Sequence, residues 1–213
     1  MERLTPGCPR CREPVDGPAG PDCAGHGSGP LLWRAGEVSY DAFVEHLATA
    51  RDFPTYLPWP MAPGWAVSDF GVVTQPSGVP VASLTSVSGT SELDGPVDVL
   101  LVAEEPGVGL GARCAGLPGR DPGHEVGDQQ PVVRVRIGSL TSSLWTVSTS
   151  GVSGPAELDR SVLAGEAAGR WLWVVLRPAS AVLLMRDDWI LRDVSGGGPL
   201  MVEMPFAGPG PVW

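Results

Sequence analysis

The spacing of apolar and polar residues changes near residue 35. Before this point the chain is rich in glycine and proline, and its few apolar residues show no regular period. Such a segment buries too little apolar surface to offset the conformational entropy that it loses on ordering. We therefore expect residues 1–35 to be ordered by something other than a hydrophobic core, or to be disordered.

The first regular pattern is that of an amphipathic helix. Four apolar residues fall at positions i, i+3, i+4 and i+7, which places them on one helical face: Tyr40, Phe43, Val44 and Leu47. Ser39 is a suitable N-cap, Asp41 lies in the first turn, and Pro54 ends the segment.

A proline-rich stretch follows at residues 57–65, which we call the strap. Its three prolines exclude a regular helix and restrict the residues before them to extended conformations. We expect the strap to be stiff and extended, with Trp59 and Trp65 as its anchors.

Alternating apolar residues and β-branched residues then predict a series of strands, separated by clusters of Gly, Pro or Ser. The short connections after the first two strands favour antiparallel neighbours. The predicted strands are residues 65–74, 79–87, 97–103, 132–137 and 144–148.

A second helix is expected at residues 165–176, because this run of Ala, Leu and Trp is long for a strand and Pro178 would stop it. Gly165 and Gly169 would lie one turn apart on that helix, where small residues allow close approach to another element. Two further strands are predicted afterwards, at residues 181–185 and 189–194.

Three cysteines and a histidine have the spacing of a structural zinc site. Cys8 and Cys11 form one pair two residues apart, and Cys23 and His26 form another. Each tight turn can point two ligands at one metal ion, and metal binding would supply the folding energy that this segment lacks. Four protein ligands leave no open position for catalysis, so the zinc would be structural. The alternatives are free thiols in a disordered segment, or an oxidised cysteine pair.

These elements together predict an α+β protein, with a small zinc knuckle followed by a largely antiparallel sheet and helices packed on it. The expected parts are a zinc-knuckle segment (1–35), an α+β domain (36–195) and an irregular tail (196–213).

Composition and net charge limit the cellular location and the binding partners that we expect. The 213 residues are 43% hydrophobic, which suffices for one main core. The net charge of −10 opposes broad attraction to phosphate backbones, so nucleic acid is a poor candidate partner. The chain start lacks the pattern of a signal peptide, and the most apolar stretch, residues 171–185, is interrupted by Arg177 and Pro178. We expect a cytoplasmic protein that does not span a membrane.

A glycine-rich loop after the strand at 97–103 is the other candidate binding element. A P-loop needs a lysine, which this chain lacks, and a dinucleotide site needs a parallel βαβ unit. Glu104 and Glu105 are adjacent, so in a strand they would face opposite sides and could not act as an acid and base pair without a bend. A solvated turn is the competing interpretation. The candidate ligand-binding residues are Glu104, Glu105, Gly107, Gly109, Gly111 and Arg113.

Other reactive side chains carry no catalytic signal. Cys114 lacks the positive cluster that would lower its pKa, and we interpret it as a buried or incidental thiol. His46 and His124 have no neighbour in sequence that would make either a general base. Asp187 and Asp188 are interpreted as turn residues.

Several of these features occur together in one known family. The cysteine pairs, the strap, the run from Leu100 to Ala112 and the segment from Gly165 to Trp173 resemble a family of uncharacterised actinobacterial proteins. Some members carry the automatic label "phosphotransacetylase family". The resemblance covers nearly the whole chain and implies a bacterial, intracellular setting. Acyl transfer between coenzyme A and phosphate needs a cluster of basic groups, whereas the arginines here are scattered.

The leading hypothesis is a non-enzymatic module that binds a small molecule or a protein partner, with the knuckle as a rigid interaction surface. Eight tryptophans favour a binding role. One alternative is an enzyme acting on a phosphorylated or acylated metabolite, with Glu104 or Glu105 as base. The other is a nucleic-acid-binding zinc ribbon, supported by four local arginines: Arg3, Arg10, Arg12 and Arg34.

Overall fold

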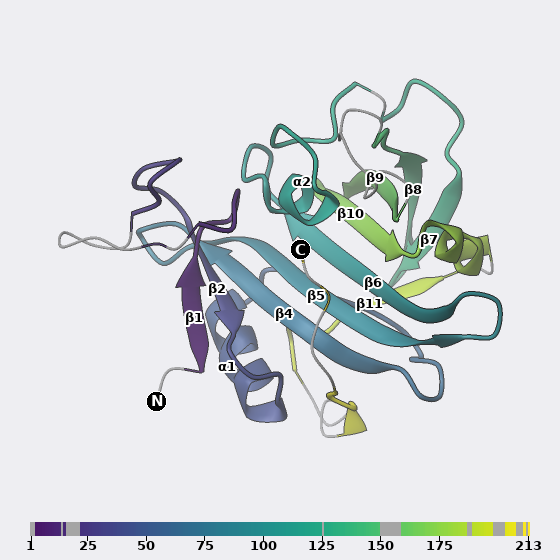
Figure 1. Ribbon diagram of the computed structural model, residues 1–213, viewed down its shortest axis with the longest axis horizontal. Helices are drawn as coiled ribbons and strands as arrows, with labels where there is room; N and C mark the ends of the chain where they lie inside the picture. Colours follow the sequence, from purple (N-terminus) through teal and green to yellow (C-terminus); the bar gives the residue numbers. More distant parts are fainter. Residues whose placement is uncertain are drawn as a thin grey trace.

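One eleven-stranded sheet organises the chain (Figure 1). The computed structural model describes residues 3–13, 15, 22–124, 126–149, 159–186, 189–197, 203–207, 211 and 213. The spatial strand order is β1-β2-β4-β5-β6-β10-β9-β8-β7-β11-β3. Neighbouring strands are antiparallel, except that β11 runs parallel to β7.

The strands are β1 (Leu4–Gly7), β2 (Leu31–Ala35), β3 (Tyr56–Pro58), β4 (Ala66–Thr74), β5 (Pro80–Ser91), β6 (Gly95–Glu104), β7 (Val133–Ile137), β8 (Leu140–Thr146), β9 (Ser161–Ala167), β10 (Arg170–Arg177) and β11 (Ile190–Asp193). The helical segments of the described residues are α1 (Tyr40–Ala50), α2 (Leu110–Ala115) and the 3-10 helix η2 (Ala179–Arg186). None of these helices has the length and hydropathy needed to cross a bilayer.

Helix α1 confirms the first sequence prediction. The Ser39 hydroxyl accepts a hydrogen bond from the Ala42 N–H at 3.3 Å, which is an N-cap contact, and Asp41 lies in the first turn. Of the four apolar residues predicted on one face, Phe43 and Leu47 are buried, but Tyr40 and Val44 are exposed. The five strands predicted between residues 65 and 148 are also confirmed, as β4 to β8. The expectation of a largely antiparallel sheet is therefore met. The α+β class with helices packed on the sheet is not confirmed, because strands dominate the described residues and helices are few.

The helix predicted at residues 165–176 is wrong, because this segment forms the β9–β10 hairpin. Successive strand residues point to opposite faces, and both faces of β10 are buried. This arrangement produces a continuous apolar run that resembles a buried helix in sequence. The apolar residues of β10 divide between two hydrophobic clusters: Leu172, Val174 and Leu176 in one, and Trp173 and Val175 in the other.

One glycine of this hairpin lies in its turn, and the other allows a neighbouring strand to lie close. Ala168 and Gly169 have φ angles of 53° and 79°, which fits a two-residue hairpin turn. A Cβ built on Gly165 would lie 2.0 Å from the carbonyl oxygen of Ser143 on β8. Gly165 therefore allows β8 and β9 to lie close together.

The strand predicted at residues 181–185 is also wrong, since these residues lie in η2. Ala181 and Met185 are both buried, and both belong to the hydrophobic cluster that contains α1 residues. The strand predicted at residues 189–194 is confirmed as β11. The turn expected at Asp187 and Asp188 lies outside the described residues.

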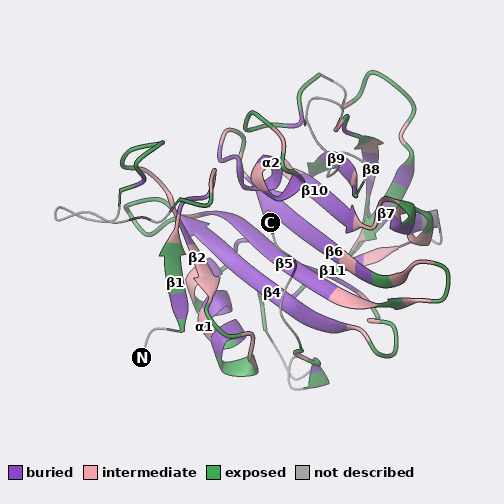
Figure 2. Cartoon of the chain, in the orientation of Figure 1, coloured by how far each residue is buried: buried purple, intermediate pink, exposed green. Residues whose placement is uncertain are grey.

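Both faces of the central strands are buried (Figure 2). One face meets the cluster that contains α1 residues, and the other meets the cluster that contains α2 residues. His46 on α1 is fully buried, with ring centroids 5.5 Å from Phe43 and 5.4 Å from Phe70. Burial lowers its pKa to about 3, so this histidine is neutral and packs as an aromatic ring.

The strap begins in strand β3, which pairs with β11. Hydroxyl groups of Ser83 and Thr85 on β5 donate hydrogen bonds to the carbonyl oxygens of Pro54 and Tyr56. These bonds hold the residues just before the strap against β5, and the Trp59–Pro60 peptide within the strap is cis.

The described residues near both ends of the chain join the same structure. Strand β1 pairs with β2, and β2 pairs with β4, so the strands that flank the cysteine segment extend the sheet. The Val67 N–H donates to the Pro205 carbonyl at 2.8 Å, and the Trp213 side chain is buried. The division at residues 35 and 195 stays a prediction, but described parts of all three segments pack together.

Replacing Gly165 with alanine distinguishes a strand from a helix at this position. In a helix, alanine would add about 1 kcal/mol of stability. In β9 the new methyl group would collide with the Ser143 carbonyl, and we expect urea denaturation to show a loss of about 3 kcal/mol. Gly196→Ala is the control, because no atom lies within 4 Å of its built Cβ. A Gly165→Ala protein as stable as the parent would contradict the β8–β9 contact.

Candidate metal centre and ligand pocket

The predicted knuckle residues meet at one point. The ligand atoms of Cys8, Cys11, Cys23 and His26 all lie within 4.8 Å of one another. The His26 Nδ1 lies 3.5 Å from the Cys8 sulfur and 3.6 Å from the Cys23 sulfur, and the Cys11 and Cys23 sulfurs are 3.4 Å apart. Metal–ligand bonds of about 2.0–2.3 Å in a tetrahedron require ligand separations of roughly 3.4–3.8 Å. The four residues could therefore hold a metal ion.

Local backbone turns explain why the ligands come in pairs. The Arg10 N–H donates to the Cys8 sulfur at 3.5 Å, which folds the chain around the first pair. The Gly27 N–H donates to the Cys23 carbonyl at 2.7 Å, and the His26 N–H donates to the same oxygen at 3.2 Å. Two residues between ligands is the spacing that such turns need to aim both side chains inward.

The thiols of this cluster differ in acidity. Burial opposes ionisation of Cys23, but hydrogen bonds with His26 and Cys11 outweigh it and lower the pKa of Cys23 to about 6. Burial raises the pKa of Cys11 to about 11. One ligand thus ionises readily near neutral pH, and a metal cation would favour loss of the other protons.

Arg113 connects the knuckle to the core. Its guanidinium donates a hydrogen bond to the Cys8 carbonyl and lies 4.8 Å from the centroid of the Trp213 ring. The Trp213 indole N–H donates to the buried Asp69 at 2.6 Å. Arg34 pairs with the same carboxylate at 2.6 Å and lies 4.4 Å from the same ring. Arg113 is one of the predicted ligand-binding residues. Its guanidinium contacts the knuckle through Cys8 and the core through Trp213.

The two glutamates of the glycine loop are separated, as predicted for adjacent strand residues. Glu104 is fully buried and accepts hydrogen bonds from the Trp173 indole at 2.6 Å and the Leu110 N–H at 2.8 Å. Burial raises its pKa to about 7. Glu105 instead pairs with Arg170 at 3.0 Å. The two carboxylates do not face one another.

The loop glycines have backbone and packing roles. Gly107 and Gly109 have φ angles of 84° and 89°, which favour glycine. A Cβ on Gly111 would lie 2.2 Å from the Trp173 ring, so that glycine admits the indole that bonds to Glu104. Cys114 follows on α2 and is buried, which raises its pKa. Whether these residues bind a ligand stays a prediction.

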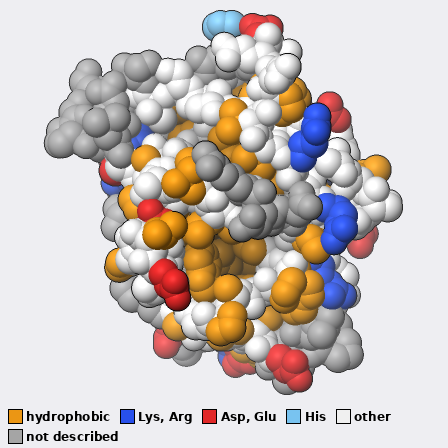
Figure 3. Space-filling model, turned by 90° about the vertical axis from the view of Figure 1, so that its right-hand side faces the viewer, with side chains coloured by type: hydrophobic (Ala, Val, Ile, Leu, Met, Phe, Trp, Pro, Cys, Tyr) orange, Lys and Arg blue, Asp and Glu red, His pale blue; other side chains and the backbone are white. Residues whose placement is uncertain are grey.

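A second candidate site is a cavity that the sequence did not predict. The volume of the cavity is about 560 Å³. Figure 3 shows the side of the molecule on which hydrophobic side chains surround a hollow. It is lined by Pro58, Trp59, Pro60, Met61, Ala62, Trp65, Val87, Thr90, Ser91, Glu92, Leu93, Leu184, Trp189 and Ile190. These residues come from the strap, the end of β5, the β5–β6 turn, η2 and the start of β11.

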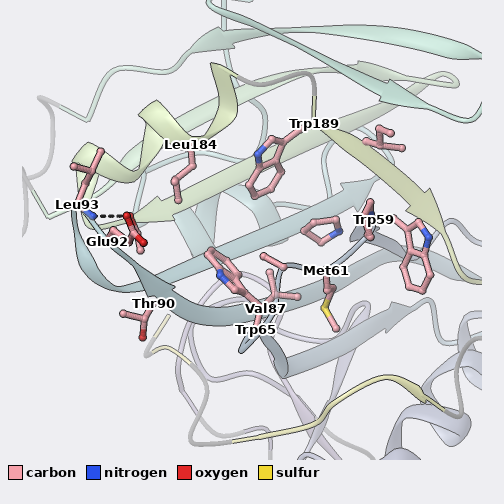
Figure 4. A pocket seen from close by; sticks show the side chains of 14 residues that line it. Trp59, Met61, Trp65, Val87, Thr90, Glu92, Leu93, Leu184 and Trp189 are labelled. Atoms are coloured by element: carbon pink, nitrogen blue, oxygen red, sulfur yellow. Dashed lines mark hydrogen bonds between the residues drawn. The ribbon is translucent and has the colours of Figure 1, made fainter.

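Two indoles face one another across this cavity, Trp65 from the strap and Trp189 from the segment before β11 (Figure 4). A Cβ built on Gly89 would lie 2.5 Å from Cγ and from Cδ2 of Trp65, so one face of this ring rests on the β5 backbone. The opposite face is turned toward the cavity. Glu92 and Thr90 lie at one end (Figure 4). The tryptophans of the strap were the sequence signal for this site, but they were interpreted only as anchors.

Cys23→Ser tests the metal centre. We expect freshly purified, reduced protein to contain about one zinc ion per chain by elemental analysis, and the variant to contain almost none, because a structural site needs all its ligands. Its melting temperature should also fall. Cys114→Ala is the control, since that thiol is buried on α2 and should leave the metal content unchanged. Full metal content in Cys23→Ser would contradict the assignment.

Glu104→Gln tests the raised pKa of this buried carboxyl. The folded state keeps a proton that the unfolded chain loses near the ordinary value of 4.5, so this contribution to stability is complete below pH 4.5 and is lost as pH rises to about 7. Glutamine does not titrate. As pH rises across this window, the unfolding free energy of the parent should therefore fall relative to that of the variant by about 1.4 kcal/mol per pH unit. A stability difference between the parent and the variant that does not change with pH would contradict the raised pKa.

Comparison with known proteins identifies the family of this chain. Searches of curated proteins and of solved structures find no match. A family of unknown function (DUF6758) matches residues 2–212, which include the knuckle, the glycine loop and the pocket. Because this match spans nearly the whole chain, the protein belongs to that family.

Proposed function

We propose that this protein is a non-enzymatic binding protein, whose tryptophan-lined cavity takes a small hydrophobic molecule. The cavity is the observation that carries the proposal. Its volume of about 560 Å³ lies in the range of small-molecule sites. Its walls are mainly apolar, and a few polar groups at one end can orient a ligand, which is the usual composition of such sites.

Zinc is the metal that we assign to the knuckle, in a structural role. Three thiol groups and one imidazole, with ligand atoms within 4.8 Å of one another, match the ligand types that zinc prefers in closed sites. The four cysteines form no disulfide, so Cys8, Cys11 and Cys23 have the reduced form that zinc binding in a compartment such as the cytoplasm requires.

The enzyme alternative, including a phosphotransacetylase-like activity, has less support. Both oxygens of Glu104 accept hydrogen bonds inside the core, and Glu105 is paired with Arg170. A general base must reach its substrate, which a fully buried carboxyl cannot do without rearrangement. A protein partner is the second candidate, because Leu93 lines the cavity and is 85% exposed.

The binding proposal is tested with N-phenyl-1-naphthylamine, an uncharged dye whose fluorescence rises in apolar surroundings. We expect a saturable increase with a dissociation constant on the order of 10 μM. Trp65→Ala and Trp189→Ala should each weaken binding about tenfold, because each removes one wall of the cavity. Trp145→Ala is the control, since that indole bonds to the Gln129 carbonyl outside the cavity. Absence of saturable binding, or equal losses in all three variants, would reject the proposal.

A further inference from the structure

The cavity carries charge of only one sign among its described lining residues. Glu92 is its acidic side chain, and no described lining residue is basic. Thr90 and Ser91 add hydroxyl groups at the same end. Arg192 lies 5.2 Å from the centroid of the Trp59 ring, but it does not line the cavity.

The indole faces are a second feature that selects for charge. The Trp65 ring rests on Gly89 with one face and turns the other toward the cavity, opposite Trp189 (Figure 4). The face of an indole is the negative part of its quadrupole and attracts cations within about 6 Å. Arg192 already uses this attraction on Trp59.

We propose that the ligand is a small organic cation, whose quaternary or tertiary ammonium group lies between Trp65 and Trp189 with Glu92 beside it. This inference rests on the proposed binding function of the cavity and names its ligand class. The hydrocarbon part of the ligand would pack on the remaining apolar wall, formed by Met61, Val87 and Leu184.

Anionic ligands fit this site poorly. A phosphate, sulfonate or carboxylate would meet Glu92 and the negative indole faces without a basic partner among the described lining residues. The net charge of −10 also lowers the local concentration of anions around the protein and raises that of cations. An uncharged ligand would gain the apolar contacts but neither electrostatic contribution.

Three probes of similar shape separate these contributions: benzyltrimethylammonium, its uncharged carbon analogue neopentylbenzene, and phenylmethanesulfonate. Each is titrated against the dye N-phenyl-1-naphthylamine bound to the full chain. We expect the cation to bind about tenfold more tightly than the neutral analogue and at least about thirtyfold more tightly than the anion, in keeping with cation–π energies.

Two variants then assign the preference to residues. Trp65→Leu keeps an apolar wall but removes the indole face, and should weaken the cation about fivefold while changing the neutral probe less than about twofold. Glu92→Gln should weaken the cation about twofold, because an exposed carboxylate contributes little. Glu105→Gln is the control, since that carboxylate pairs with Arg170 away from the cavity, and should leave all three affinities unchanged.

The outcomes distinguish this inference from the proposed function. If the dye binds but the neutral or anionic probe displaces it as well as the cation does, the cavity is a binding site and the cation preference is wrong. A Trp65→Leu protein that retains the preference would also overturn it. If the dye itself does not bind, the proposed function fails.

Discussion

Burial of both faces of the central sheet is the constraint on which the rest of the structure depends. Strands β5, β6 and β10 each contain a continuous run of buried residues, so each face needs its own covering layer. Helix α1 and the strap contribute to one layer, and helix α2 with Trp213 contributes to the other. The cavity forms where the strap and η2 cover the end of β5 incompletely, and its tryptophans line that gap.

Carboxyl groups inside this sheet require partners, because an unpaired buried acid is costly. Glu104 on β6 and Asp69 on β4 each accept a hydrogen bond from an indole N–H, supplied by Trp173 and Trp213. Gly111 is needed to admit the first of these rings. In the sequence, the tryptophans and the glycine-rich run suggest a binding role. Trp173, Trp213 and Gly111 instead complete the core.

How far the sequence predicts each feature depends on how local its cause is. The knuckle spacing and the Ser39 cap are set within a few residues, and the structure has both. The β9–β10 hairpin was missed because a strand buried on both faces has the apolar run of a buried helix. The cavity could not be predicted, because Trp65 and Trp189 are distant in sequence and only the tertiary fold, including the pairing of β3 with β11, places them around one cavity.

The metal centre and the cavity lie at opposite ends of β5, which argues for separate roles. The knuckle adjoins the end of the sheet where β2 pairs with the last residues of β4, whereas the cavity takes residues from Val87 onward (Figure 1). The seven residue steps of β5 from Pro80 to Val87 alone span about 23 Å, which is too far for a metal to touch a bound ligand. Arg113 instead connects the metal centre to the core, because its guanidinium donates to the Cys8 carbonyl and lies over Trp213, which belongs to one covering layer of the sheet.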